Sequence, residues 1–202
     1  AMPGVRTVSS TAFTADLEDI FFVLFDQLDI DVELAKIDKY ADFDEDTYKA
    51  MIEEAYRVAR EVLDPINALG DREGCTFDPE TGVSTPDEFK NAWTQIVEGG
   101  WVSVNAPADV GGIGLPAVMA AVVSELFSGS AMAFTMYMGL TAAAARIVNQ
   151  FMVNWDFSDM VAEKMFTGEW GGTMCLTESH CGTDLGIIKT RAVPQADGGY
   201  AI

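Results

Sequence analysis

Apolar side chains recur every three to four positions through most of the chain, and this spacing is typical of amphipathic helices. It predicts helices over residues 16–28, 47–69, 86–97, 117–127, 131–151 and 158–166. We expect the second helix to kink or stop near Pro65, since proline cannot donate a backbone hydrogen bond. The third is expected to start with a capping box formed by Thr85 and Glu88. Residues 70–85 are rich in turn formers and are interpreted as a loop.

The pattern changes near residue 171. Residues 173–177, 187–193 and the chain from Tyr200 onward are β-like and are separated by turn residues. The predicted fold is therefore mainly α. It has a tag or disordered end at 1–11, an N-terminal helical bundle at 12–170, and the opening strands of a β domain at 171–202. Two or three strands cannot close a core of their own, so we expect the natural domain to continue past Ile202.

The charge of the chain restricts its partners. The formal net charge is -20, and fourteen acidic residues lie between Asp16 and Glu54 against only three lysines. Nucleic acids and anionic membranes are bound by basic surfaces, so neither is an expected partner. The simplest interpretation of the acidic stretch is a strongly solvated face. Any phosphorylated ligand is expected to bind elsewhere.

Cysteine usage and hydrophobicity bear on location. Cys75, Cys175 and Cys181 are an odd, scattered set, which predicts reduced thiols and a cytoplasmic protein. The uncharged stretch 128–145 is the one candidate for a membrane span. It is built from Ala, Gly, Ser, Thr and Met, so a buried bundle helix is the favoured interpretation.

The most informative motif lies near the C-terminal end and reads Met174-Cys175-Leu176-Thr177-Glu178-Ser179-His180-Cys181-Gly182-Thr183-Asp184. It resembles the signature of acyl-CoA dehydrogenases. Residues 98–116, with a Gly-Gly-x-Gly-Leu-Pro run, and residues 162–170, with a Gly-Glu-Trp turn, are similar to further family segments in the family's order. The resemblance covers about residues 45–202. The wording of the motif is most similar to the subgroup that includes methylthiopropanoyl-CoA dehydrogenases.

The resemblance implies an FAD cofactor. By analogy with the family, Met174, Leu176 and Thr177 would line the flavin ring, while Gly182 and Thr183 would meet the pyrophosphate. Glycine allows close approach because a Cβ would hold the phosphate away. Thr183 would also lie near the phosphopantetheine of CoA. Ser179 stands where the family usually has proline, so the turn is expected to be less rigid.

Other candidate positions are weaker. By resemblance, Phe134 and Met138 would face the acyl tail of the substrate, although a Met and aromatic stripe at helical spacing is more often plain core. Cys175, His180 and Cys181 lack the spacing and the fourth ligand of a metal site, so no metal is expected. Residues 111–114, Gly-Gly-Ile-Gly, lack a preceding strand and are interpreted as a tight loop between helices.

The reaction implied by the family is α,β-dehydrogenation of an acyl-CoA thioester, in which a carboxylate removes the α-proton and the β-hydrogen leaves as hydride to the flavin. In the family that carboxylate lies in a C-terminal helical domain, and no acid here corresponds to it. Glu178 is expected to hold its loop. We therefore predict no catalytic residue in this chain, and expect an inactive fragment of a homo-oligomeric enzyme served by electron-transfer flavoprotein or a similar acceptor. Alternatives are an acyl-CoA oxidase and a non-enzymatic acidic helical binding module.

Overall fold

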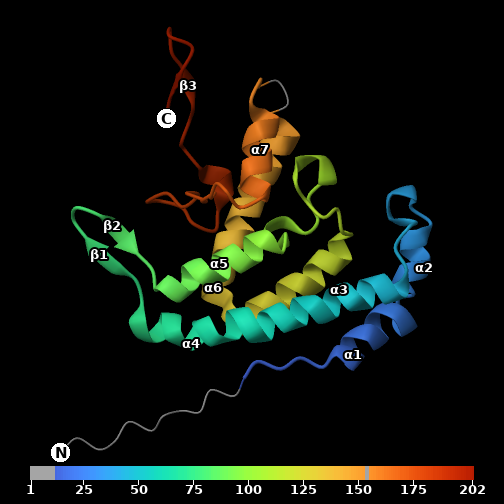
Figure 1. Ribbon diagram of the computed structural model, residues 1–202. Coiled ribbons are helices and arrows are strands. Elements are labelled where there is room, and N and C mark those ends of the chain that lie inside the picture. The colour runs from blue at the N-terminus through green and yellow to red at the C-terminus, as the bar shows by residue number, and fades with distance from the viewer. Residues whose placement is uncertain (1–11, 153–154) are drawn as a thin grey trace, which may run out of the picture. The chain divides into compact units, whose positions relative to one another are not determined.

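The computed structural model describes residues 12–152 and 155–202, so the end expected at 1–11 lies outside the described residues. The chain divides into two units, Ala1–Gly172 and Thr173–Ile202. The first is helical, and the second contains only short strands and turns (Figure 1). The fold is mainly α with a few short strands after the helices, as the hydrophobic pattern predicts.

The first predicted helix forms as two consecutive pieces. Helix α1 (Leu17–Phe21) begins where the Asp16 side chain accepts hydrogen bonds from the backbone N–H groups of Glu18 and Asp19. A wider π-helical segment, Phe22–Gln27, continues it. Asp29 then adopts a left-handed conformation with φ of 47°, and a separate helix, α2 (Ile30–Ala35), follows. This six-residue helix was not predicted, because it is too short to show a hydrophobic repeat.

The second predicted helix is longer than expected. Helix α3 (Glu45–Val58), the π-helical segment Ala59–Leu63 and helix α4 (Asp64–Glu73) form one continuous run, visible in Figure 1. Pro65 does not end it, because proline is tolerated in the first turn of α4 and a wider π turn precedes it. The Asp44 side chain caps the start of the run by accepting the N–H of Thr47 at 2.8 Å.

Residues 70–85 form structure where only a loop was expected. After α4 ends, strands β1 (Thr76–Asp78) and β2 (Gly82–Ser84) pair as an antiparallel hairpin. Its turn is closed by Asp78, whose carboxylate accepts the N–H groups of Glu80 and Thr81. The loop prediction is therefore wrong for the hairpin, because turn-forming residues mark both loops and the tips of short hairpins.

Helix α5 (Asp87–Glu98) starts one residue later than the capping-box pattern required. Pro86 occupies the capping position and makes no side-chain hydrogen bond to the helix. The predicted capping box of Thr85 and Glu88 is thus wrong, since the motif needs the hydroxyl residue directly before the first helical residue. The glycine-rich residues 111–114 do form a loop, between a short 3-10 turn (Ala108–Val110) and the next helix.

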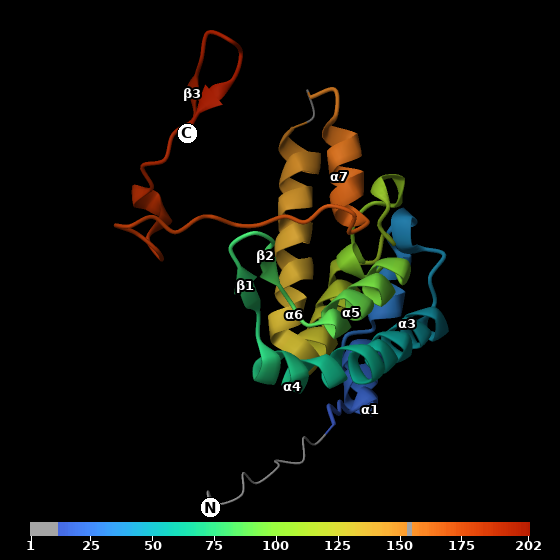
Figure 2. The same cartoon turned by 60° about the vertical axis from the view of Figure 1, so that its left-hand side comes forward.

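Helix α6 (Ala117–Phe151) joins the two apolar helices that the pattern separated. Ala131 has non-helical angles of -153° and 73°, which mark a kink directly after the sequence Ser128-Gly129-Ser130. Helix α7 (Ser158–Phe166) packs along α6, and the two lie side by side in Figures 1 and 2.

The core of the first unit surrounds the first half of α6. Fully buried side chains from α3, the π segment, α5 and α6 meet there, among them Tyr48, Ile52, Leu63, Ile96 and Leu126. Helix α6 is long and apolar enough to cross a membrane by length and composition, but such a helix also occurs in the core of soluble proteins. Its packing against α3, α4 and α7 agrees with the predicted bundle helix.

The second unit has little regular structure. Strands β3 (Val193–Pro194) and β4 (Tyr200–Ala201) pair antiparallel, and Leu185–Ile187 forms a 3-10 turn. The strand predicted over 173–177 is absent from this described unit, and of the strand predicted over 187–193 only Val193 lies in a strand. The side chains there are almost all exposed, so no neighbouring strand or core stabilises an extended segment.

Candidate functional site

The signature motif folds into a loop closed on itself by its own backbone. Glu178 and Cys181 form an isolated antiparallel bridge, with N···O distances of 3.0 Å and 3.2 Å in the two directions. Cys181 is the one buried side chain among residues 173–202, all of which are described. The bridge places Ser179 and His180 at the tip of a tight turn directly before Gly182 and Thr183.

A second contact ties the motif to the chain that follows it. The Glu178 carboxylate accepts the backbone N–H of Lys189 at 3.0 Å and that of Thr190 at 2.9 Å. Hydrogen bonds from Thr190 and from the backbone N–H of Lys189 hold the pKa of Glu178 below its ordinary value. Glu178 is therefore an ionised carboxylate whose oxygens face backbone donors, and the expectation that it holds the loop agrees with this geometry.

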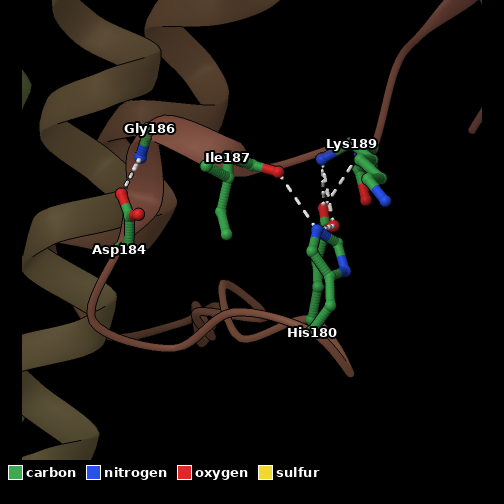
Figure 3. A network of polar contacts seen from close by, with 7 residues as sticks. His180, Asp184, Gly186, Ile187 and Lys189 are labelled. Atoms are coloured by element: carbon green, nitrogen blue, oxygen red, sulfur yellow. Dashed lines mark hydrogen bonds and ion pairs between the residues drawn. The ribbon is translucent and has the colours of Figure 1, made fainter.

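His180 and Asp184 make further contacts within the same loop (Figure 3). One ring nitrogen of His180, Nε2, lies 3.0 Å from the carbonyl oxygen of Ile187 and 3.5 Å from a carboxylate oxygen of Glu178. Asp184 accepts the N–H of Gly186 at 3.2 Å and so caps the 3-10 turn. The loop from Glu178 to Thr190 is thus held by polar contacts across its width.

The five predicted flavin-binding residues all lie in this second unit. Met174 and Leu176 expose 53% and 41% of their surface, and Thr177, Gly182 and Thr183 are exposed as well. Two large apolar side chains left open to water beside an open hydroxyl suit a ligand with an aromatic ring.

Gly182 tests whether these residues fit a flavin cofactor. Its φ is not positive, and a Cβ built at this position would meet only Thr177 Cγ2, at 4.0 Å, which is an ordinary contact. Neither the backbone conformation nor internal packing therefore requires a glycine here. A close-approaching phosphate would require it, so the residues present fit the pyrophosphate of FAD.

An aromatic cavity opens in the helical unit, with a volume of about 480 Å³. Phe134 lies in its wall, 2% exposed, with its ring 5.5 Å from that of Phe89 and 6.3 Å from that of Trp93. Tyr137 completes the aromatic cluster. Sequence reasoning missed Phe89, Trp93 and Tyr137, although Phe89 and Trp93 are four residues apart, a spacing that places both on one helix face.

Met138 does not share that cavity. It lines a separate groove of about 430 Å³ on α6, near the hydrogen bond that Arg146 donates to Asn105 at 2.5 Å. The structure therefore does not bring Phe134 and Met138 together in one pocket of the described chain. Although four residues apart on one helix, they border different hollows, because α5 covers the Phe134 side and residues 101–105 cover the Met138 side.

One group of residues in the described chain is of the types that can bind a metal ion and lies close together: Glu178, His180 and Cys181, whose donor atoms lie within 4.8 Å of one another. Cys175, which the sequence placed near this group, is an exposed free thiol outside it, and Cys75 is likewise free and exposed. Both oxygens of Glu178 and Nε2 of His180 already contact backbone groups. These contacts account for the cluster as part of the loop's internal network.

Known proteins match both units. The sequence profile of the acyl-CoA dehydrogenase N-terminal domain matches residues 45–152. The chain is 34% identical over 193 residues to 3-methylmercaptopropionyl-CoA dehydrogenase of Ruegeria pomeroyi, an alignment that covers 94% of this chain and 32% of that protein. It is 33% identical over 181 residues to a butyryl-CoA dehydrogenase of Syntrophomonas wolfei, covering 88% of the chain and 29% of the relative.

A third relative is the broad-specificity linear acyl-CoA dehydrogenase FadE5 of Mycobacterium tuberculosis, 31% identical over 94% of the chain and 31% of that protein. The chain spans about a third of the length of the curated relatives it matches. Since the family profile covers more than half of the chain and follows its helices from α3 to α6, this chain belongs to the acyl-CoA dehydrogenase family.

Proposed function

We propose that the protein carrying this chain is an FAD-dependent acyl-CoA dehydrogenase that introduces an α,β double bond into an acyl-CoA thioester. The observation that carries the proposal is Gly182, a glycine in the signature loop with no internal reason to be one. Family membership supplies the reaction class. In this reaction a bound flavin accepts the hydride that leaves the β-carbon.

Within this proposal the second unit holds the cofactor. Thr183 presents an exposed hydroxyl next to Gly182, so the pair would meet the pyrophosphate, with Thr183 also close to the phosphopantetheine of CoA. Met174, Leu176 and Thr177 would line the flavin ring.

Charge supports this assignment. Residues 173–202 contain three acidic and two basic residues, so they contribute only -1 to the chain's net charge of -20. FAD and CoA are both polyanions and are repelled least by this part of the chain.

The substrate is proposed to be a thioester with a short acyl chain. The cavity that Phe134 lines is walled by four aromatic rings, a volume and chemistry suited to a small apolar group. The names of two relatives, 3-methylmercaptopropionyl-CoA and butyryl-CoA dehydrogenase, refer to short acyl groups. Met138 remains a weaker candidate, since it borders a different groove.

The remaining features of the proposal follow from the family. The electrons are passed to electron-transfer flavoprotein or a similar acceptor, the protein is a homo-oligomer, and the catalytic carboxylate lies outside these 202 residues. The proposed cytoplasmic location rests instead on the odd, scattered cysteines. We expect no dehydrogenase turnover from the 202-residue chain alone.

The cofactor assignment is tested by titrating FAD into the flavin-free whole protein that carries this chain. Thr183→Val removes only the hydroxyl, and its loss is expected to raise the dissociation constant of FAD about tenfold, the usual effect of deleting a hydrogen bond to a charged group. Thr135→Val, which removes a hydroxyl bonded to a carbonyl within α6, is the matched control. Equal FAD affinity in both variants would contradict the assignment.

A further inference from the structure

The loop from Glu178 to Thr190 has almost no packing to hold it. Cys181 is its only buried side chain, and Leu185, Ile187 and Ile188 are exposed. A loop without a core relies on its polar contacts for a defined shape. The loop also carries Gly182 and Thr183, so its shape decides where their backbone and hydroxyl groups lie.

Glu178 places a negative charge in this loop. A carboxylate near a bound pyrophosphate costs electrostatic energy, because the two like charges repel. Its presence therefore needs a compensating role within the protein. The structure supplies one, since both carboxylate oxygens face backbone donors eleven and twelve residues further along the chain.

The negative charge of the carboxylate strengthens these hydrogen bonds. Lys189 donates to both oxygens, at 3.2 Å and 3.0 Å, and Thr190 donates to one of them at 2.9 Å. Hydrogen bonds to an ionised acceptor are about twice as strong as neutral ones. The side chain of Glu178 is only 17% exposed, so water competes weakly for its oxygens.

The other contacts within the loop span fewer residues. The Glu178–Cys181 bridge closes only a four-residue turn, and Asp184 acts only on Gly186. Nε2 of His180 lies 3.0 Å from the carbonyl oxygen of Ile187, seven residues further along the chain (Figure 3). Ser179 has no ring to fix its own backbone angle. The carboxylate is thus the main connection between the two ends of the loop.

We propose that Glu178 is a positioning residue for the cofactor: its carboxylate clamps the backbone of Lys189 and Thr190 and so holds Gly182 and Thr183 in place for a pyrophosphate. The cofactor part of this inference rests on the function proposed above. The clamp itself depends only on the geometry of this loop.

The test compares Glu178→Gln and Glu178→Ala in the whole protein that carries this chain. Hydrogen exchange at the amides of Lys189 and Thr190 is measured on flavin-free protein, and FAD affinity is measured by titration. Glu80→Ala, which removes an exposed acid from the β1–β2 turn, is the control. The melting temperature of each variant reports whether the helical unit stays intact.

We expect Glu178→Ala to abolish protection of both amides and to weaken FAD binding roughly tenfold to a hundredfold. Glu178→Gln keeps one acceptor oxygen, so it should restore part of the protection and part of the affinity. The melting temperature should stay within a few degrees of the wild type in all variants, since the helical core is untouched.

Two results would overturn the inference. One is unchanged amide protection in Glu178→Ala, which would mean that the carboxylate does not hold the loop. The other is lost protection with unchanged FAD affinity, which would mean that the clamp does not position the cofactor site. A wild-type protein that binds no FAD would instead contradict the proposed function, and the exchange data would still decide whether the clamp exists.

Discussion

At the scale of single residues, three residues of the signature loop differ in what they contact. The Glu178 carboxylate accepts hydrogen bonds from the protein's own backbone, Gly182 leaves space, and Thr183 offers a hydroxyl to solvent. The first therefore affects the shape of the free loop, whereas in the proposed function the other two would contact a ligand. This difference makes their variants distinguishable by experiment.

Replacing Gly182 with alanine should leave the fold unchanged and weaken the cofactor site. The new Cβ would have an ordinary contact with Thr177, so the melting temperature of the flavin-free protein should not move. A phosphate held away by that Cβ would lose at least one charged hydrogen bond, which corresponds to an increase of about tenfold or more in the dissociation constant of FAD. Thermal unfolding and FAD titration of the same sample measure both effects. Lower stability with unchanged affinity would mean that the glycine serves the fold.

The Glu178 clamp should depend on pH in one direction only. The pKa of Glu178 is held below its ordinary 4.5 by hydrogen bonds from Thr190 and Lys189. A carboxylate with a lowered pKa contributes while it is ionised, and its contribution is lost as the pH falls through that lowered value. Nε2 of His180, the titratable group beside Glu178, lies 3.5 Å from one of its carboxylate oxygens.

Protection of the Lys189 and Thr190 amides should therefore be constant from pH 7 down to about 4.5 and decline below it. Amide exchange, corrected for the intrinsic effect of pH on exchange rates, measures this. A loss of protection centred near neutral pH would contradict the assignment to Glu178.

At the scale of elements, α6 is the scaffold of the helical unit. Phe134 on this helix lines the aromatic cavity, and Met138 lines the second groove. Thr141, further along the helix, contacts the residue at which the unit ends. The hydroxyl oxygen of Thr141 accepts the N–H of Gly172, the last residue of the unit, at 3.0 Å. The helix thus fixes the point at which the chain leaves the bundle.

Two glycines near α6 should respond oppositely to alanine. Gly139 lies at an exposed position away from the ends of α6, and an added Cβ would meet no other atom. Gly139→Ala should therefore stabilise the protein by about 1 kcal/mol through helix propensity. A Cβ at Gly172 would lie 2.8 Å from Ala144 Cβ and 3.2 Å from Thr141 Cα, atoms that cannot swing aside. Gly172→Ala should therefore cost about 1–3 kcal/mol.

Urea unfolding of the two variants measures both changes. If Gly172→Ala proved as stable as the wild type, the close packing of the chain against α6 at this point would be refuted.

Sequence alone predicted the elements whose stability comes from burying one face. The long helices carry apolar residues at helical spacing, and these are the residues that form the core, such as Ile52 and Val62. The pattern predicted two helices, 117–127 and 131–151, where the structure has one helix kinked at Ala131, after the weak helix formers Ser-Gly-Ser. The hydrophobic pattern thus located the irregular position, but it did not show that one helix continues through it.

The errors arise where the structure depends on neighbours rather than on the local pattern. The extended residues 173–177 have β-like composition but no partner strand in the described chain, so they form no ladder. The motif indicated which residues belong to the candidate site, through resemblance. It could not indicate that Lys189 and Thr190 supply the amides bound by Glu178, because that contact depends on how the loop closes.

At the scale of the whole molecule, charge separates the two units. Most of the acidity lies in the helical unit, where several of the cations pair with nearby acids. Arg57, for example, contacts Glu54 at 2.6 Å and Glu61 at 2.8 Å. Such exposed pairs contribute little stability, so the acidity mainly sets what the surface attracts. It leaves the nearly neutral residues 173–202 as the part of the chain best suited to anionic FAD and CoA.

The central claim is that this chain is part of a flavin-dependent acyl-CoA dehydrogenase. It is tested most directly by the visible absorption spectrum of the whole protein that carries it, recorded without oxygen before and after butyryl-CoA is added. We expect the absorption of oxidised flavin, which bleaches when the acyl-CoA reduces it. A colourless protein that takes up no added FAD would contradict the proposed function and favour the acidic helical binding module.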